Sequence, residues 1–141
     1  MLAGAHAFET FGDMAPCALC LKQREIYWGA ATLALAALVL VRRRPDAAGF
    51  ANLALGLVFL VGAGVAAYHV AVEHHLVIAR CDADLDLSAI APLGASGTLD
   101  IPRCDQPAWT MFGISMAGYN ALLSLVYAGL SFFAARSARH A

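Results

Sequence analysis

The chain contains 141 residues, of which 61% are hydrophobic and 13% are charged, and its formal net charge at pH 7 is −1. A soluble domain carries about 25% charged residues, so this composition is that of a membrane protein. The charge is too balanced for a nucleic-acid partner. The sequence contains neither a basic patch with interleaved aromatic residues nor a glycine-rich phosphate loop.

The first segment, Met1 to Gly12, is partly apolar but too short to cross a bilayer. It lacks the basic start and the cleavage site of a signal peptide. We expect it to be the outer half of a transmembrane helix whose beginning is absent from the chain. The alternative is an interfacial helix that lies flat on the membrane.

Three longer apolar segments follow. Ile26–Val41 has sixteen residues, Phe50–Val72 has twenty-three and Ala108–Ala135 has twenty-eight. About twenty residues span the hydrocarbon core of a bilayer, so the second and third segments cross with ease. The first crosses if Arg24 and Arg42 at its ends extend toward the interfaces. The segments predict three transmembrane helices in a single all-α membrane domain, residues 1–141.

The basic residues of the short connections gather on one side of the membrane. Arg42–Arg44 lie between the first two predicted spans, Arg136 and Arg139 follow the third, and only Asp46 opposes them. Lys and Arg in short loops mark the cytoplasmic side. The other side holds the extended loop of residues 73–106, and all four cysteines lie on or near it. In a bacterium that side is the periplasm, where disulfides persist.

Cys17 and Cys20 stand at the start of the first predicted span, with Arg24 one turn further along. Thiols at this spacing can close a small, strained disulfide that is easily reduced and re-formed. A helix N-terminus and a nearby Arg favour the reactive thiolate, so the pair predicts electron transfer by thiol exchange. Haem attachment is excluded because Leu21, not His, follows Cys20. Inert thiols, or a structural zinc site shared with the other two cysteines, are the alternatives.

Cys81 and Cys104 lie in the predicted outer loop, 23 positions apart. A disulfide between them would close a loop of about 24 residues and stabilise the fold by roughly 3.5 kcal/mol in the chain-entropy model. A second, reactive pair on the same side of the membrane can exchange disulfides with it. We therefore expect a redox role for this pair, with a structural staple as the alternative.

Three ionisable side chains lie near the outer ends of the predicted spans. Arg24 is four residues after Cys20, so both project from one helix face, and the guanidinium can stabilise a thiolate or an oxyanion. His69 and Glu73 are also four residues apart and should lie at about the same depth. His69 can hydrogen-bond a quinone carbonyl, and Glu73 can orient His69 or relay a proton. The alternatives are a snorkelling anchor for Arg24 and polar residues satisfied between helices for the other two.

Electrons that leave a dithiol in a membrane need an acceptor. The sequence shows no haem, flavin or iron–sulfur signature. A lipid-soluble quinone needs only an apolar groove with a few polar contacts, so a quinone is the acceptor that we expect.

A longer pattern joins these residues in order along the chain: Pro16-Cys17-Ala18-Leu19-Cys20 with Gln23-Arg24, Tyr68-His69 with Val72-Glu73, and Arg103-Cys104-Asp105-Gln106 with Trp109, Phe112-Gly113, Ser115 and Asn120. In this pattern the chain resembles, from about Leu2 to its C-terminus, the disulfide bond formation protein B (DsbB) family. The four cysteines in order, together with Arg24, are the specific part of the resemblance.

The resemblance implies a four-helix transmembrane bundle in the bacterial inner membrane, with the first helix incomplete in this chain. It implies that Cys81–Cys104 oxidises a periplasmic DsbA-type thiol oxidase through a mixed disulfide, and that the electrons then pass to Cys17–Cys20. By the same resemblance, Cys20 lies against ubiquinone or menaquinone, and Arg24 and His69 shape that site.

Two other interpretations compete with this one. The first is a non-enzymatic membrane scaffold stapled by disulfides or zinc. The second is a quinone-linked oxidoreductase of the vitamin K epoxide reductase type, whose loop cysteines precede its CxxC motif, unlike the order in this chain.

Overall fold

The computed structural model describes residues 2–12, 16–78 and 104–138 of the chain. Its elements, in chain order, are α1 (Leu2–Gly12), α2 (Ala18–Arg43), the 3-10 helix η1 (Pro45–Ala47), α3 (Ala48–Glu73), β1 (Thr110–Met111), β2 (Ile114–Ser115) and α4 (Met116–Ser137). The protein is mostly helical, which confirms the predicted all-α class.

Three of the described helical segments are long and apolar enough to cross a membrane. They are Ala18–Arg43 with 26 residues, Pro45–Glu73 with 29 and Met116–Ser137 with 22. This confirms the three predicted spans. The 11-residue α1 is shorter than a span, and whether it is part of a fourth transmembrane helix stays a prediction.

The third predicted span, Ala108–Ala135, is wrong over its first eight residues. Strands β1 and β2 pair antiparallel in this stretch, and helix α4 begins only at Met116. The turn between the strands has positive φ values at Phe112 (52°) and Gly113 (76°). A continuous helix does not accommodate this left-handed backbone, so the apolar run folds as a short hairpin before the helix starts.

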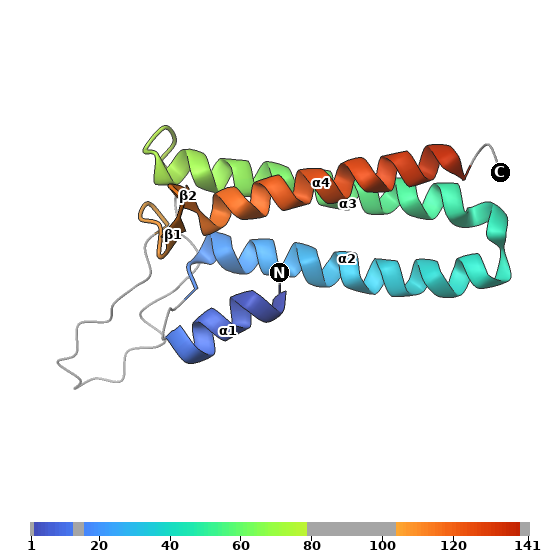
Figure 1. Ribbon diagram of the computed structural model, residues 1–141, viewed down its shortest axis with the longest axis horizontal. Helices are drawn as coiled ribbons and strands as arrows, with labels where there is room; N and C mark the ends of the chain where they lie inside the picture. Colours follow the sequence, from blue (N-terminus) through green and yellow to red (C-terminus); the bar gives the residue numbers. More distant parts are fainter. Residues whose placement is uncertain (1, 13–15, 79–103, 139–141) are drawn as a thin grey trace.

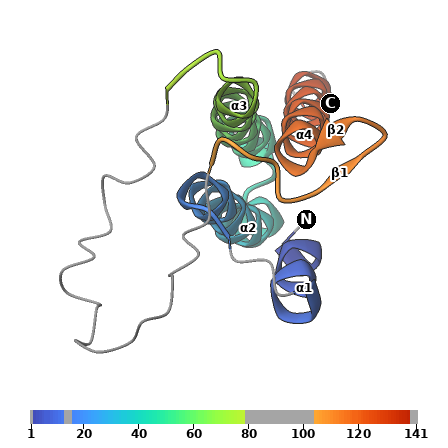
Figure 2. The same cartoon turned by 90° about the vertical axis from the view of Figure 1, so that its left-hand side faces the viewer.

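Helices α2, α3 and α4 lie side by side along the long axis of the molecule, and α1 lies beside α2 (Figure 1, Figure 2). The start of α2, the end of α3 and the start of α4 come together at one end, which we call the cysteine end because Cys17 caps α2 there (Figure 1). Arg42–Arg44 and Arg136 lie at the opposite end (Figure 1). The cysteine end and these basic residues are thus at opposite ends of the bundle. Their orientation in the membrane stays a prediction, and Arg139 lies outside the described residues.

Small side chains fill the interior of the bundle. The buried apolar residues of the three long helices include Ala30, Ala51, Ala63, Ala66, Ala117, Ala128 and Ala135. Large apolar side chains face outward instead, and Leu35 and Phe133 are 66% and 71% exposed. Small residues let helix backbones approach closely in lipid, so this distribution suits a bundle whose outer surface is covered by acyl chains.

The predicted outer loop, residues 73–106, lies mostly outside the described residues. Helix α3 ends at Glu73, the following residues are described as far as Ile78, and the description resumes at Cys104. The structure of the loop and the position of Cys81 therefore stay predictions.

Replacing Gly56 by Ala tests the close packing of α3 against α4. A Cβ atom at this position would lie 2.7 Å from Cε1 of Phe132, so the ring has to move. We expect the free energy of unfolding in detergent to fall by about 1–3 kcal/mol, as measured by denaturation followed by circular dichroism. Gly129→Ala is the matched control, because nothing lies within 4 Å of a Cβ there. Equal losses in the two variants would contradict the packing.

Candidate redox site

Cys17 caps the N-terminus of α2. Its backbone is extended (φ −72°, ψ 166°), and its Sγ accepts a hydrogen bond from the backbone N–H of Cys20 at 3.3 Å. Only 7% of Cys17 is exposed. The free N–H groups and the positive end of the helix dipole favour an anion at this position, as expected from the sequence.

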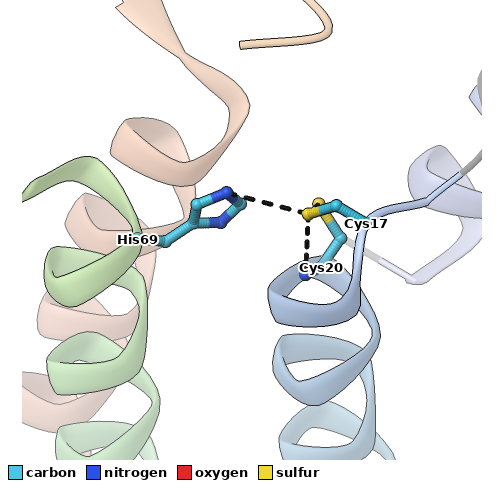
Figure 3. Close-up of side chains that lie close together, drawn as sticks. All are labelled: Cys17, Cys20 and His69. Carbon is cyan, nitrogen blue, oxygen red and sulfur yellow. Dashed lines mark hydrogen bonds between the residues drawn. The ribbon is translucent and has the colours of Figure 1, made fainter. Parts of the chain in front are cut away.

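The two sulfur atoms of the CxxC motif are 2.8 Å apart, and both cysteines are free thiols (Figure 3). The Cys20 thiol lies within hydrogen-bonding distance of the Cys17 sulfur. A disulfide bond is about 2.05 Å long, so a small rotation of either side chain brings the sulfurs to bonding distance. The geometry therefore fits a dithiol that can close and reopen.

His69 reaches this pair from α3. Its side chain is buried, and its Nε2 lies 3.8 Å from Sγ of Cys17 (Figure 3). Its Nδ1 lies 2.8 Å from Nε2 of Gln23 on α2. The predicted residue His69 thus lies beside the CxxC motif, between the two helices.

Glu73 lies one turn beyond His69 and connects α3 to α4. Its Oε1 is 3.9 Å from Nε2 of His69, and its Oε2 accepts a hydrogen bond from Oγ of Ser115 at 2.5 Å. Ser115 is the N-cap of α4, where its Oγ also accepts the N–H of Gly118 at 3.1 Å. The four-residue spacing thus correctly predicted that His69 and Glu73 lie together at the cysteine end.

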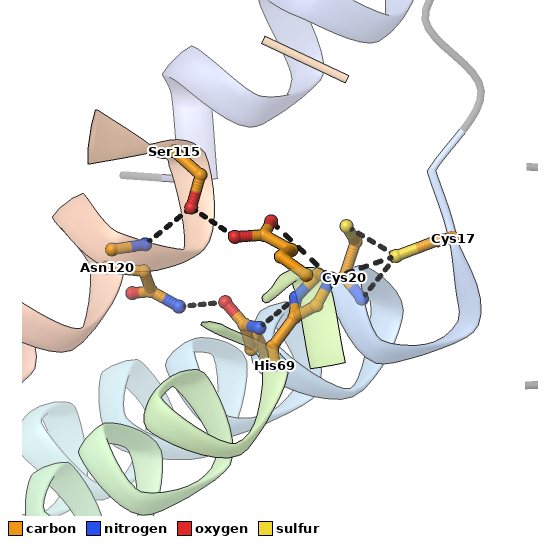
Figure 4. A network of polar contacts seen from close by, with 8 residues as sticks. Cys17, Cys20, His69, Ser115 and Asn120 are labelled. Atoms are coloured by element: carbon orange, nitrogen blue, oxygen red, sulfur yellow. Dashed lines mark hydrogen bonds and ion pairs between the residues drawn. The ribbon is translucent and has the colours of Figure 1, made fainter. Parts of the chain in front are cut away.

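Sequence reasoning did not assign a role to the amide side chains that complete this network (Figure 4). Gln23 and Asn120 are both buried, and Nδ2 of Asn120 donates to Oε1 of Gln23. Oδ1 of Asn120 accepts the hydroxyl of Tyr27 at 2.5 Å, and this hydroxyl also lies 2.9 Å from Oγ of Ser124. For Asn120 the available signal was an uncharged polar residue inside an apolar span, because such residues usually pair across helices. Gln23 lies between Lys22 and Arg24, outside the predicted span, and carried no such signal.

Arg24 turns toward α1 rather than toward the sulfurs. Its Nη1 lies 2.5 Å from Oε2 of Glu9, and its Nη2 donates to the carbonyl oxygen of Ala5 at 3.2 Å. Within the described part of the chain, the hydrogen bonds of the guanidinium therefore join α1 to α2. The predicted contact between Arg24 and a quinone stays a prediction.

Of the second cysteine pair, Cys104 is among the described residues. It is 2% exposed and disulfide-bonded. It lies in one buried cluster with Cys17 and Val72, and Cys20 packs against this cluster. Cys81 lies outside the described residues, so its pairing with Cys104 stays a prediction.

The surroundings lower the pKa of the Cys17 thiol from 9.0 to about 4. The largest cause is the hydrogen bond with the Cys20 thiol, and a further hydrogen bond with His69 acts in the same direction against the effect of burial. Because the folded value lies below the unfolded one, ionisation of Cys17 stabilises the fold. This contribution is complete above pH 9.0 and is lost as the pH falls through about 4.

The sulfur atoms of Cys17 and Cys20 and a ring nitrogen of His69 are also atoms of the kinds that bind metal ions. The ligand atoms of Cys17, Cys20 and His69 lie within 4.8 Å of one another. Two sulfurs on one tetrahedral zinc ion lie about 3.8 Å apart, given Zn–S bonds of about 2.3 Å, whereas these sulfurs are 2.8 Å apart. A metal ion would therefore have to separate the sulfurs. The set also differs from the zinc site of four cysteines that was the alternative to the redox role.

An apolar groove lies between α2 and α3 near the CxxC motif. Its volume is about 430 Å³. It is lined by Leu19, Lys22, Glu25, Ile26, Gly64, Val65 and Tyr68. Leu19 also packs against the cysteine cluster, so one end of the groove adjoins the dithiol.

Removing the thiol donor tests the cause of the low pKa of Cys17. We expect Cys20→Ser to keep a hydroxyl donor beside the Cys17 sulfur and Cys20→Ala to remove it. With Cys81 and Cys104 also replaced by Ser, Cys17 is the only thiol. The pKa of Cys17, measured from thiolate absorbance, should be higher in Cys20→Ala than in Cys20→Ser by about one unit or more. At a pH below both pKa values, this shift lowers the thiolate fraction about tenfold. Identical titration curves would contradict the assignment.

A comparison with known protein families identifies the family of the chain. A family model described as "Disulfide bond formation protein DsbB" matches residues 1–134 of the 141-residue chain. No curated protein and no solved structure gives a significant match. With nearly the whole chain matched and three helices able to span a membrane, the chain belongs to the DsbB family of membrane proteins that form disulfide bonds.

Proposed function

We propose that this protein is a thiol:quinone oxidoreductase of the bacterial inner membrane, which reoxidises a periplasmic disulfide-donating protein of the DsbA type. One observation carries the proposal. Cys17 and Cys104 lie in the same buried cluster, with Cys20 packed against it. Cys104 is in a disulfide, whereas Cys17 and Cys20 are free thiols. An oxidised cysteine and a reduced pair thus lie together, as thiol exchange requires.

The proposed reaction moves one electron pair through two disulfides. The partner's dithiol reduces a Cys81–Cys104 disulfide through a mixed disulfide, and the partner leaves with a new S–S bond. The two loop thiols then reduce a disulfide between Cys17 and Cys20. Finally, the Cys17–Cys20 dithiol gives two electrons and two protons to the quinone, which leaves as the quinol while the CxxC disulfide re-forms. Atoms and electrons balance at each step.

The groove between α2 and α3 supports a lipid-soluble electron acceptor. It adjoins the dithiol at Leu19, and its lining is almost wholly apolar. Pockets for such ligands are apolar with a few orienting polar groups, and ubiquinone or menaquinone has this character. The residues that line the groove do not include Arg24, His69 or Glu73. The proposed contacts of these three side chains with the quinone therefore rest on the sequence pattern and not on the groove.

The proposed orientation places the cysteine end in the periplasm. Arg42–Arg44 and Arg136 at the opposite end favour the cytoplasm. A periplasmic cysteine end also accounts for a stable disulfide at Cys104.

The competing function is a membrane scaffold stapled by disulfides or zinc. The ligand set of Cys17, Cys20 and His69 is the observation that favours it. Metal analysis and a thiol count of the purified protein separate the two functions. Bound zinc, with no quinone-dependent oxidation of thiols, would support the scaffold and overturn the oxidoreductase.

Cys20→Ser should abolish reduction of quinone by a reduced periplasmic thiol oxidase, because the electron pair can then no longer leave as a CxxC disulfide. The measurement is anaerobic mixing of protein, reduced partner and a quinone analogue, followed by quinone absorbance. Thr32→Val is the control, because Thr32 is exposed and its hydroxyl bonds only within its own helix, to the carbonyl of Gly29 at 2.9 Å. Unchanged turnover in the Cys20 variant would remove the proposed site.

Arg24→Ala should raise the apparent KM for the quinone about tenfold, since a hydrogen bond to a charged group contributes roughly 1.5 kcal/mol or more. The same substitution also frees α1, because Arg24 binds Glu9. Glu9→Gln therefore serves as the matched variant: it weakens the α1 contact but keeps the guanidinium. An equal rise in KM in both variants, or an effect confined to the KM of the partner protein, would argue against a quinone contact.

A further inference from the structure

Gln23 is buried between His69 on α3 and Asn120 on α4, and both polar atoms of its amide are engaged. Its Nε2 lies 2.8 Å from Nδ1 of His69, and its Oε1 accepts Nδ2 of Asn120. An amide nitrogen can only donate a hydrogen bond. Nδ1 of His69 is therefore an acceptor, and the proton of the neutral ring lies on Nε2.

The orientation of Asn120 sets the orientation of Gln23. The hydroxyl of Tyr27 donates to Oδ1 of Asn120, and Oγ of Ser124 adjoins the same hydroxyl. With Oδ1 occupied by this donor, the Nδ2 group of Asn120 faces Gln23 and requires an acceptor there. Gln23 consequently presents its oxygen to α4 and its nitrogen to His69. The direction of donation thus runs from α4 through α2 to α3 (Figure 4).

The Nε2–H group of His69 faces the Cys17 sulfur at 3.8 Å and Oε1 of Glu73 at 3.9 Å. On α2, the Cys20 thiol lies 2.8 Å from the same sulfur. A donor at Nε2 favours a thiolate, whereas a lone pair there would oppose it. The tautomer of His69 therefore bears directly on the reactive sulfur.

We propose that Gln23 and Asn120 are positioning residues that hold His69 in the tautomer that donates from Nε2 to the Cys17 sulfur. The importance of this contact for turnover rests on the proposed function, but the contact itself does not. The proposal concerns the reduced protein alone, so its test needs neither quinone nor partner protein. A failed turnover assay and a failed tautomer assay are then separate results.

The first test is the tautomer of His69 in the full chain, read from nitrogen chemical shifts of isotope-labelled histidine in detergent micelles. The chain has five histidines, and His69→Phe identifies the signal. We expect a protonated Nε2 and an unprotonated Nδ1. In Gln23→Met, which keeps the side-chain length but removes the donor, we expect a mixture of tautomers. A protonated Nδ1 in the wild type, or unchanged signals in Gln23→Met, would overturn the proposal.

The second test is the pKa of Cys17 in the variant in which Cys20, Cys81 and Cys104 are all replaced by Ser, so that Cys17 is the only thiol. Adding Gln23→Met should raise this pKa by about one unit, which is a tenfold loss of thiolate below the pKa. Thr32→Val is the control, because Thr32 is exposed and its hydroxyl bonds to the carbonyl of Gly29 in the same helix; it should leave the pKa and the tautomer unchanged. Loss of thermal stability in Gln23→Met without a change in the tautomer of His69 or in the pKa of Cys17 would mean that Gln23 is only structural, which would overturn the proposal.

If Gln23→Met does not fold, Asn120→Leu is the replacement variant. It must change the tautomer of His69 and raise the pKa of Cys17 in the same way, and unchanged values there overturn the proposal.

Discussion

The burial of one sulfur atom whose pKa is lowered is the constraint that organises the cysteine end of this protein. Cys17 is 7% exposed, and an anion taken out of water is costly unless other donors replace the solvent. The donors are the N–H and the thiol of Cys20 on the same helix and the imidazole of His69 on α3. The helix N-terminus adds its dipole. Helices α2 and α3 must therefore meet at a fixed depth, because a slip of one residue, about 1.5 Å along the axis, would break a contact that is already 3.8 Å long.

Helix α4 carries no cysteine, yet the site depends on it. Ser115 caps α4 and binds the carboxylate of Glu73, the last residue of α3, so the end of one helix is tied to the start of the next. One turn further along, Asn120 binds Gln23 on α2. These polar contacts form because small side chains such as Ala66 and Ala117 let the helices approach closely. In the described residues no buried side-chain nitrogen or oxygen lacks a hydrogen-bond partner, as an apolar environment demands.

Features that depend on spacing within one helix could be predicted from the sequence, and features that depend on packing between helices could not. The four-residue spacing correctly placed His69 beside Glu73, and the apolar runs correctly predicted three spans. Gln23 and Asn120 are 97 positions apart, and only the packing of α2 against α4 selects them as partners.

Arg24 shares a helix face with Cys20, but its long side chain extends to α1 instead. The direction of a Cα–Cβ bond limits where such a side chain starts, not where its charged end lies. The hairpin before α4 was missed because its residues continue the apolar run of the helix without a charge. The structure instead turns at Phe112 and Gly113, where φ is positive, and pairs the flanking residues as strands.

The arrangement of donors also discriminates between metal binding and redox chemistry at the CxxC motif. A histidine that binds a metal through one ring nitrogen usually donates the other N–H to a carboxylate or a carbonyl group. Here the other nitrogen of His69 faces the amide nitrogen of Gln23, which is itself a donor. To bind a metal at Nε2, His69 would need Gln23 and then Asn120 to turn around, in addition to a separation of the sulfurs of Cys17 and Cys20. Closing a disulfide needs neither change, because the sulfurs are already 2.8 Å apart and the imidazole donates to the one that becomes the thiolate. The contacts around Cys17, Cys20 and His69 thus fit disulfide chemistry more closely than metal binding.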